Sequence, residues 1–218
     1  MSKFYAVKNG KVPGIYNTWP ECQAQVNGFS GAIYKSFSSI EEAEAFLYGK
    51  SLTTQKVDGL IAYVDGSFNE TNNTCGYGVY IEDGPNKYVI CGKFVQTNGG
   101  RNIEGEVMGG LKAAKFAYEH NKPITIYHDY QGVGSWATGE WKRNKTYTNK
   151  YYTHIQNMIN NGLNVTFKHV TGHSNNKGNE YVDRLAKFGC GIQLTKSDID
   201  FLSDISDAEG FPEELAKF

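Results

Sequence analysis

Two apolar segments that each end in an aspartate place the tightest constraint on how this chain can fold. Residues 60–64 lead directly into Asp65, and residues 124–128 lead into Asp129. The β-branched and aromatic side chains of both segments predict strands. A carboxylate embedded in a central strand is costly to desolvate unless positive charge compensates it. Either the fold supplies that charge, or these aspartates are ordinary turn formers or caps.

The pattern around these two segments predicts one α/β domain. Strands are expected at residues 60–68, 76–82, 87–95, 124–128 and 163–170. Helices are expected at residues 104–118, 130–137, 148–160 and 176–188. In the first helix, an inward face is predicted at Val107, Leu111, Ala114 and Tyr118. The order βββαβααβα predicts a mixed five-stranded sheet with flanking helices.

A smaller unit is expected ahead of this domain. Residues 1–48 predict a small α+β domain with three short strands, a helix at 19–26 and a last helix opened by a capping box at Ser39 and Glu42. Residues 49–59 are polar and without periodicity, which predicts a linker. The expected division is therefore 1–48, a linker at 49–59, a second domain at 60–192 and an extension at 193–218.

Charge is unevenly distributed along the chain. The net charge of −1 combines five basic and four acidic residues in 1–50, fifteen and twelve in 51–192, and two and seven in 193–218. A nucleic-acid partner is therefore not indicated by overall charge, and any basic surface must be local. The acidic extension either docks on the protein or competes electrostatically with nucleic acid. Docking would use its apolar side chains Ile199, Phe201, Leu202 and Phe211.

The cysteines and the distribution of apolar residues indicate where in the cell the protein is located. The four cysteines are far apart and form no CxxC pair, which argues against a zinc site and a disulfide framework. The first twenty residues contain three lysines and no apolar run, and no segment approaches the length of a membrane span. We expect a cytoplasmic protein with no membrane contact and no obligate protein partner.

Four carboxylates stand in positions where phosphodiester chemistry needs them. Asp65 and Asp129 end strands, while Glu106 and Asp183 lie on helices. Phosphodiester cleavage uses two Mg²⁺ ions about 3.5–4 Å apart, and such hard cations prefer oxygen ligands. Taken singly, Glu106 is explained by the helix dipole and Asp183 by a solvated helix face. Glu104 competes with Glu106 for the same role.

Five ordered motifs between about residues 60 and 190 resemble those of type 1 ribonuclease H. They are Tyr63-Val64-Asp65-Gly66-Ser67, Asn102-x-x-x-Glu106, Asp129-x-Gln131, Thr171-Gly172-His173-Ser174 and Asn179-Glu180-x-x-Asp183. The resemblance implies hydrolysis of the RNA strand of RNA–DNA hybrids to 5′-phosphate and 3′-hydroxyl products. It assigns two Mg²⁺ ions, replaceable by Mn²⁺, to Asp65, Glu106, Asp129 and Asp183, and gives His173 a part in proton transfer or product release.

The same resemblance implies contacts with the hybrid. Only RNA presents a 2′-hydroxyl in the wide minor groove, and the family places Asn102 and Gln131 there. Gly66 and Ser67 would approach the RNA backbone through their main-chain N–H groups. Residues 136–150 interleave basic and aromatic side chains. This segment is either a contact with the DNA strand or a solvated loop with two core tryptophans.

The front unit is similar to the hybrid-binding domain, of caulimovirus type, that precedes many such ribonucleases. The similarity rests on Phe4-Tyr5-Ala6-Val7, Gly14, Thr18-Trp19-x-x-Cys22-x-x-Gln25-Val26 and Tyr34-Lys35-Ser36-Phe37. It assigns Tyr5, Trp19 and Tyr34 to a nucleic-acid surface and Lys35 to a phosphate. The alternative makes Trp19 and Tyr34 core aromatics.

Two other functions compete with a hybrid nuclease. One is an inactive protein that coats hybrids or double-stranded RNA, which would normally lack one of the four carboxylates. The other is a strand transferase of the transposase or integrase kind on the same fold. The Asn179-Glu180 motif and the front unit favour the nuclease over the transferase.

Overall fold

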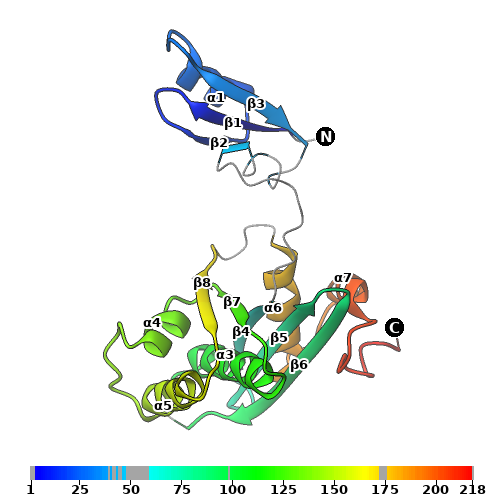
Figure 1. Ribbon diagram of the computed structural model, residues 1–218. Helices are drawn as coiled ribbons and strands as arrows, with labels where there is room; N and C mark the ends of the chain where they lie inside the picture. Colours follow the sequence, from blue (N-terminus) through cyan, green and yellow to red (C-terminus); the bar gives the residue numbers. More distant parts are fainter. Residues whose placement is uncertain are drawn as a thin grey trace. The chain divides into compact units, whose positions relative to one another are not determined.

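In a computed structural model, the chain divides into two compact units, Met1–Val57 and Asp58–Phe218. The structure describes residues 3–38, 40, 43, 46–47, 59–97, 99–171 and 176–217. Each unit has a sheet and a hydrophobic core of its own (Figure 1).

The front unit is a three-stranded antiparallel sheet with one described helix. Strand β1 (Phe4–Asn9) lies between β2 (Gly14–Tyr16) and β3 (Ile33–Phe37), and α1 (Trp19–Val26) packs on β1. Thr18 and Glu21 begin α1 with a capping box, in which the Thr18 N–H donates to the Glu21 carboxylate at 3.0 Å. The capping box predicted at Ser39 and Glu42 lies outside the described residues, as does the linker apart from Gly59.

The second unit has the predicted mixed five-stranded sheet. Its first three strands form an antiparallel meander of β4 (Leu60–Asn69), β5 (Thr74–Asp83) and β6 (Asn86–Val95). On the other side of β4, β7 (Ile124–His128) and β8 (Val165–His169) run parallel to it, so the strand order is β6-β5-β4-β7-β8. The predicted fold class is therefore confirmed.

Helices cover both faces of this sheet (Figure 1). One face carries α3 (Asn102–Glu119), α4 (Gly132–Thr138) and α5 (Thr146–Asn160), and the other carries α6 (Lys177–Gly189). The alternation of side chains along the strands explains this arrangement. On β4, Val64 packs into the cluster with α3, whereas its neighbour Tyr63 packs against the cluster with α6.

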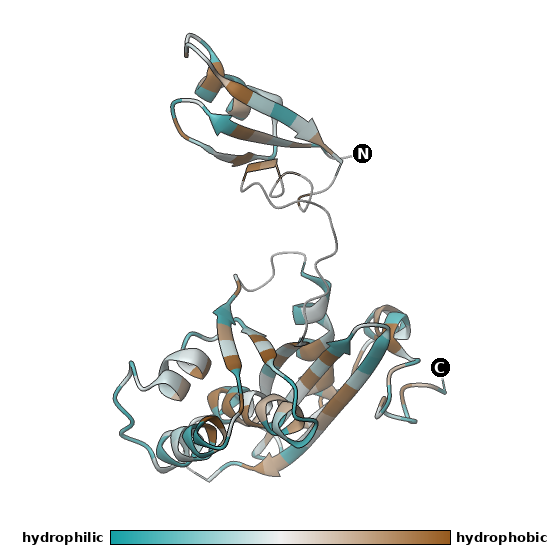
Figure 2. Ribbon diagram, in the orientation of Figure 1, coloured by the Kyte–Doolittle hydropathy of each residue, from teal (hydrophilic) through white to brown (hydrophobic). Residues whose placement is uncertain are grey.

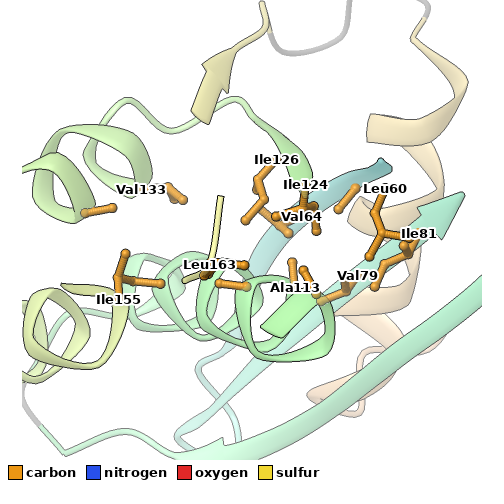
Figure 3. Close-up of a cluster of buried hydrophobic side chains, with 14 of the residues drawn as sticks. Leu60, Val64, Val79, Ile81, Ala113, Ile124, Ile126, Val133, Ile155 and Leu163 are labelled. Atoms are coloured by element: carbon orange, nitrogen blue, oxygen red, sulfur yellow. The ribbon is translucent and has the colours of Figure 1, made fainter. Parts of the chain in front are cut away.

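The main core lies between the sheet and α3, α4 and α5 (Figure 3). Ile126 is fully buried at the centre of β7, and Val64 and Ile155 reach the same cluster from β4 and α5. Hydrophobic residues, brown in Figure 2, lie along the strands and on the helices beside them. Because burial of one such side chain stabilises a fold by about 1.5–3 kcal/mol, this cluster is what fixes β4, β7 and α3 together.

The inward face of α3 differs from the predicted one. Val107 and Ala114 are buried as expected, but Tyr118 is 41% exposed. The residues closest to the sheet include Ala113 and Ala117, both fully buried. Small side chains allow the helix to approach the sheet closely, so the line of contact follows them and the larger Tyr118 lies at its edge.

The C-terminal extension docks on the second unit. It forms α7 (Lys196–Leu202) and the 3₁₀ turn Ser203–Ile205, neither of which was predicted. Leu202 and Ile205 enter a second cluster with Tyr181 of α6 and Val89 of β6. The Val89 N–H also donates to the Glu209 carbonyl at 2.8 Å. The segment therefore completes a core on the α6 side of the sheet.

No helix among the described residues has the length and apolar character needed to cross a lipid bilayer.

We expect Leu202→Ala to lower the free energy of unfolding of the second unit by about 2–5 kcal/mol, because a fully buried leucine would leave a cavity. Val95→Ala is the matched control, since Val95 is 64% exposed and its truncation should change little. Urea unfolding of the full chain measures both. Equal and small effects would show that the extension does not contribute to the core.

Candidate active site

Asp65 and Asp129 meet because their strands are parallel neighbours. The register pairs Tyr63 with Tyr127, so each aspartate stands two residues beyond the same position on adjacent strands. The Asp65 side chain is 8% exposed, and one of its oxygens accepts a hydrogen bond from the Gly66 N–H at 2.6 Å. The carboxylates that follow the two apolar segments therefore lie at the same edge of the sheet.

Glu106 joins them from the first half of α3. A Cβ atom on Gly66 would collide with the main chain of Glu106, and one on Gly105 would collide with the main chain of β5 at Gly76. Glycine at these positions therefore allows helix and strands to approach closely. Carboxylate oxygens of Asp65, Glu106 and Asp129 all lie within 4.8 Å of one another.

Asp183 lies at the rim of the same pocket. The pocket has a volume of about 560 Å³ and is lined by all four predicted carboxylates. Among the described residues, Asp183 alone of the four forms an ion pair, with Lys187 one helical turn away at 2.7 Å. The four carboxylates therefore converge as two buried groups, the half-buried Asp129 and one paired group at the rim.

Burial dominates the electrostatics of the inner group. The pKa of Asp65 is raised from an ordinary value of 3.8 to about 7, with burial as the largest cause and the neighbouring Asp129 carboxylate as a further one. Burial also raises the pKa of Glu106, and the charge of Asp65 adds to this shift. The buried Glu106 Oε2 accepts no hydrogen bond from any described residue. Adjacent carboxylates in a dry site cannot all be ionised without a compensating positive charge.

These residues fit a hard divalent cation. All the donors are carboxylate oxygens, three of them share one small volume, and one oxygen lacks a partner among the described residues. Mg²⁺ and Mn²⁺ prefer such ligands, and a cation would remove the cost of ionising Asp65 and Glu106.

Glu104 faces elsewhere. It is 4% exposed, and its carboxylate accepts a hydrogen bond from the Gly100 N–H at 2.9 Å. It lines a different pocket, beside Tyr147 and His154. Of the two competing glutamates, Glu106 is the one beside Asp65.

Only some of the other predicted site residues line the carboxylate pocket. Gly66 and Asn102 line the carboxylate pocket. Among the described residues that line it, Ser67 and Gln131 are absent, and the Gln131 amide instead donates to the Ser135 hydroxyl at 3.3 Å. His173 lies outside the described residues.

Comparison with known proteins matches each unit to a family model of its own. The profile of the family described as RNase H matches residues 58–191, and that described as Ribonuclease H1 N-terminal domain matches residues 3–47. Since the first match covers more than half of the chain, it decides the family. The chain belongs to the ribonuclease H family. The predicted resemblance to type 1 ribonuclease H is confirmed, and with it the prediction of a ribonuclease H enzyme at the level of the family.

Individual relatives agree with this assignment. Ribonuclease H of Saccharomyces cerevisiae is 29% identical over 187 residues, which cover 74% of this chain and 53% of that protein. Ribonuclease H1 of Homo sapiens is 26% identical over 258 residues, covering 85% and 88%. The chain thus spans about half the length of the yeast protein and most of the human one.

A solved structure shows the same fold. LC11-RNase H1 in complex with RNA/DNA hybrid superimposes with a TM-score of 0.50 and 16% identity, over 60% of this chain and 96% of that one. Identity this low supports likeness of fold alone.

In the front unit, three predicted residues form one aromatic cluster. The Trp19 ring lies 5.7 Å from that of Tyr5 and 5.8 Å from that of Tyr34. Trp19 is 39% exposed and Tyr34 45%, so the alternative that these are core aromatics is wrong. The core of the unit is formed instead by Val7, Cys22 and Val26. Lys35 is exposed, with its amino group 5.5 Å from the centre of the Phe37 ring.

The basic and aromatic segment 136–150 does not have the two core tryptophans of one alternative. Trp136 packs against the main core, whereas Trp141 is 40% exposed. Their rings are in edge contact, with centres 5.7 Å apart. One tryptophan is thus structural and the other lies on the surface.

Several residues that line the pocket received no role from the sequence, among them Asn179, Arg184 and Asp198. The Asn179 amide donates to Asp129 at 3.1 Å. Asn179 stands one turn before Asp183 on α6, and this i, i+4 spacing is a signal that could have found it. Arg184 and Asp198 also line the pocket, and the position of Asp198 on the extension gave no signal.

The raised pKa values predict a pH-dependent stability in the absence of divalent cations. The folded state retains protons that the unfolded state releases, so the unfolding free energy should fall as the pH rises from about 4 through about 7. Asp65→Asn removes one of these groups. The variant should therefore exceed the wild type in melting temperature near pH 8, and the difference should shrink towards about pH 4. Thermal unfolding in EDTA measures this, and a difference independent of pH would contradict it.

Proposed function

We propose that this chain hydrolyses the RNA strand of RNA–DNA hybrids with two divalent ions, leaving 5′-phosphate and 3′-hydroxyl ends. The observation that carries the proposal is the convergence of Asp65, Glu106 and Asp129 in one pocket, with Asp183 at its rim. Membership of the ribonuclease H family supports it, as does the fold shared with an enzyme solved on an RNA/DNA hybrid.

The ligands of the ions would be Asp65, Glu106, Asp129 and Asp183, with Mg²⁺ as the cofactor and Mn²⁺ as a substitute. When bound, the ions supply an activated water and stabilise charge on the leaving 3′ oxygen. The protein holds the carboxylates in place: Asn179 donates to Asp129, and the Gly66 N–H donates to Asp65. From the motif alone, His173 would assist proton transfer or product release.

Selection of the RNA strand would depend on the residues beside the carboxylates. Asn102 and Gly66 line the same pocket, which suits contacts with a 2′-hydroxyl and the RNA backbone. We assign Gln131 and Ser67 to the same groove by family motif only.

The front unit would bind the hybrid independently, through Tyr5, Trp19, Tyr34 and Lys35. The exposed ring cluster suits stacking against sugars or bases, and Lys35 suits a phosphate. In this proposal residues 1–48 bind, 49–59 link, 60–192 cut, and 193–218 complete the catalytic unit. Tethering would raise the local concentration of one binding site near the other to about the millimolar range.

The decisive experiment uses a labelled RNA–DNA duplex with Mg²⁺ and a matched pair of variants. The wild type should cut the RNA strand, Glu106→Gln should lower the rate by about 10³-fold or more because it removes a metal ligand, and Glu104→Gln should cut at nearly the wild-type rate. An RNA strand left intact by the wild type with either Mg²⁺ or Mn²⁺ would overturn the proposal. A slow Glu104→Gln with an active Glu106→Gln would show that the wrong glutamate is assigned.

For the front unit, Trp19→Ala combined with Lys35→Ala should weaken binding to long hybrids about 10- to 100-fold, with little effect on hybrids too short to span both units. Val12→Ala is the control, because Val12 is 57% exposed in the same unit and lies outside the aromatic cluster. Fluorescence anisotropy on the two lengths measures the difference. Unchanged affinity for long hybrids would make this surface structural only.

A further inference from the structure

Arg184 lines the carboxylate pocket from α6 and is held there on several sides. Its Nε donates to Asp198 at 3.1 Å, and its Nη1 donates to the Glu180 carbonyl at 2.9 Å. The centre of the guanidinium lies 4.3 Å from the Phe201 ring centre. The Arg184 side chain is 20% exposed, which is low for a long charged side chain. Its contacts fix the plane of the guanidinium at the wall of the pocket.

Two of these anchors come from the C-terminal extension. Asp198 and Phe201 lie on α7, which is beyond the span matched by the ribonuclease H family, residues 58–191. Asp198 is itself fixed by Thr195, whose hydroxyl donates to it at 2.7 Å. This hydrogen bond is the main reason that the pKa of Asp198 is lowered, so the carboxylate that faces Arg184 stays ionised.

The remaining edge of the guanidinium is available to a ligand. Among the described residues, Nη2 of Arg184 has no hydrogen-bond acceptor. A planar guanidinium offers donors in a fork that matches phosphate oxygens, and an arginine that is already ordered loses little freedom on binding. The same pocket holds the carboxylates assigned to the metal ions.

We infer that Arg184 binds a phosphate of the RNA strand near the cut, and that the C-terminal extension orients it through Asp198 and Phe201. This inference rests on the proposed function, because it takes the strand in the pocket to be RNA. Arg184 acts on substrate binding, while Asp198 and Phe201 are positioning residues that act through it.

The test removes one phosphate charge at a time. Hybrids with a single neutral methylphosphonate linkage in the RNA strand, moved position by position around the cut, are bound to the full chain carrying Asp65→Asn, which should leave them uncut. With Arg184 present, one position should weaken binding about tenfold, as expected for a lost charged hydrogen bond. With Arg184→Met this tenfold loss of affinity at one position, the penalty, should disappear, because the partner of the phosphate is gone.

Two further variants separate this role from general effects. Lys196→Met removes a positive charge from α7 at an 84% exposed side chain and should keep the tenfold penalty. Phe201→Leu leaves the charge unchanged and should reduce the penalty to about threefold, because the ring under the guanidinium is lost. Thermal unfolding checks that each variant is folded, and Arg184→Gln replaces Arg184→Met if the latter is not.

A penalty that persists in Arg184→Met at every position would overturn the inference. So would a penalty lost equally in Lys196→Met, since that result indicates charge in general. If the wild type leaves RNA in hybrids uncut, the proposed function fails. In that case a position-specific penalty in the Asp65→Asn chain still reports whether Arg184 binds phosphate.

Discussion

Mutual repulsion between buried carboxylates is the constraint on which this structure depends. Asp65 and Glu106 are 8% and 3% exposed, and the charge of Asp65 raises the cost of ionising Glu106. A fold tolerates such a pair only where surrounding packing holds both backbones in place, and here the cluster around Val64 and Ile126 does so. The buried carboxylates therefore lie on elements that the main hydrophobic cluster fixes, which is what a preorganised metal site requires.

The same constraint explains how the helices meet the sheet. Glu106 arrives on α3 and Asp183 on α6, from opposite faces. In both cases the helix packs closely on a glycine of the sheet. A Cβ on Gly66 would collide with the main chain of α3, and one on Gly78 would collide with the main chain of α6 at Val182. Carboxylates on separate helices can share one pocket only if both helices approach the strands this closely. Glycine in these strands is thus a requirement of the site, although it weakens a strand by itself.

Much of the fold and most of the carboxylate site could be predicted, because each depended on local pattern or on ordered motifs. Alternating apolar residues set the five strands, and the motif spacing separated Glu106 from Glu104 before any geometry was known. The inward face of α3 was misjudged at Tyr118, since periodicity counts hydrophobicity whereas packing favoured the small Ala113 and Ala117. Arg184 and Asp198 were missed for another reason: contact between α6 and the extension is tertiary, and nothing in either segment alone encodes it.

Tertiary contacts of the extension also show where its acidic side chains lie and what they pair with. Four of its aspartates form ion pairs, three of them with bases of the preceding domain: Lys87 with Asp207, Lys177 with Asp204 and Arg184 with Asp198. The exposed pairs of Lys87 and Lys177 add little stability, so the apolar contacts of Leu202 and Ile205 hold the segment in place. The charges have a different consequence. An aspartate matched to a lysine or arginine repels a nucleic acid less than an unpaired one does, so docking lowers the electrostatic competition that the extension exerts.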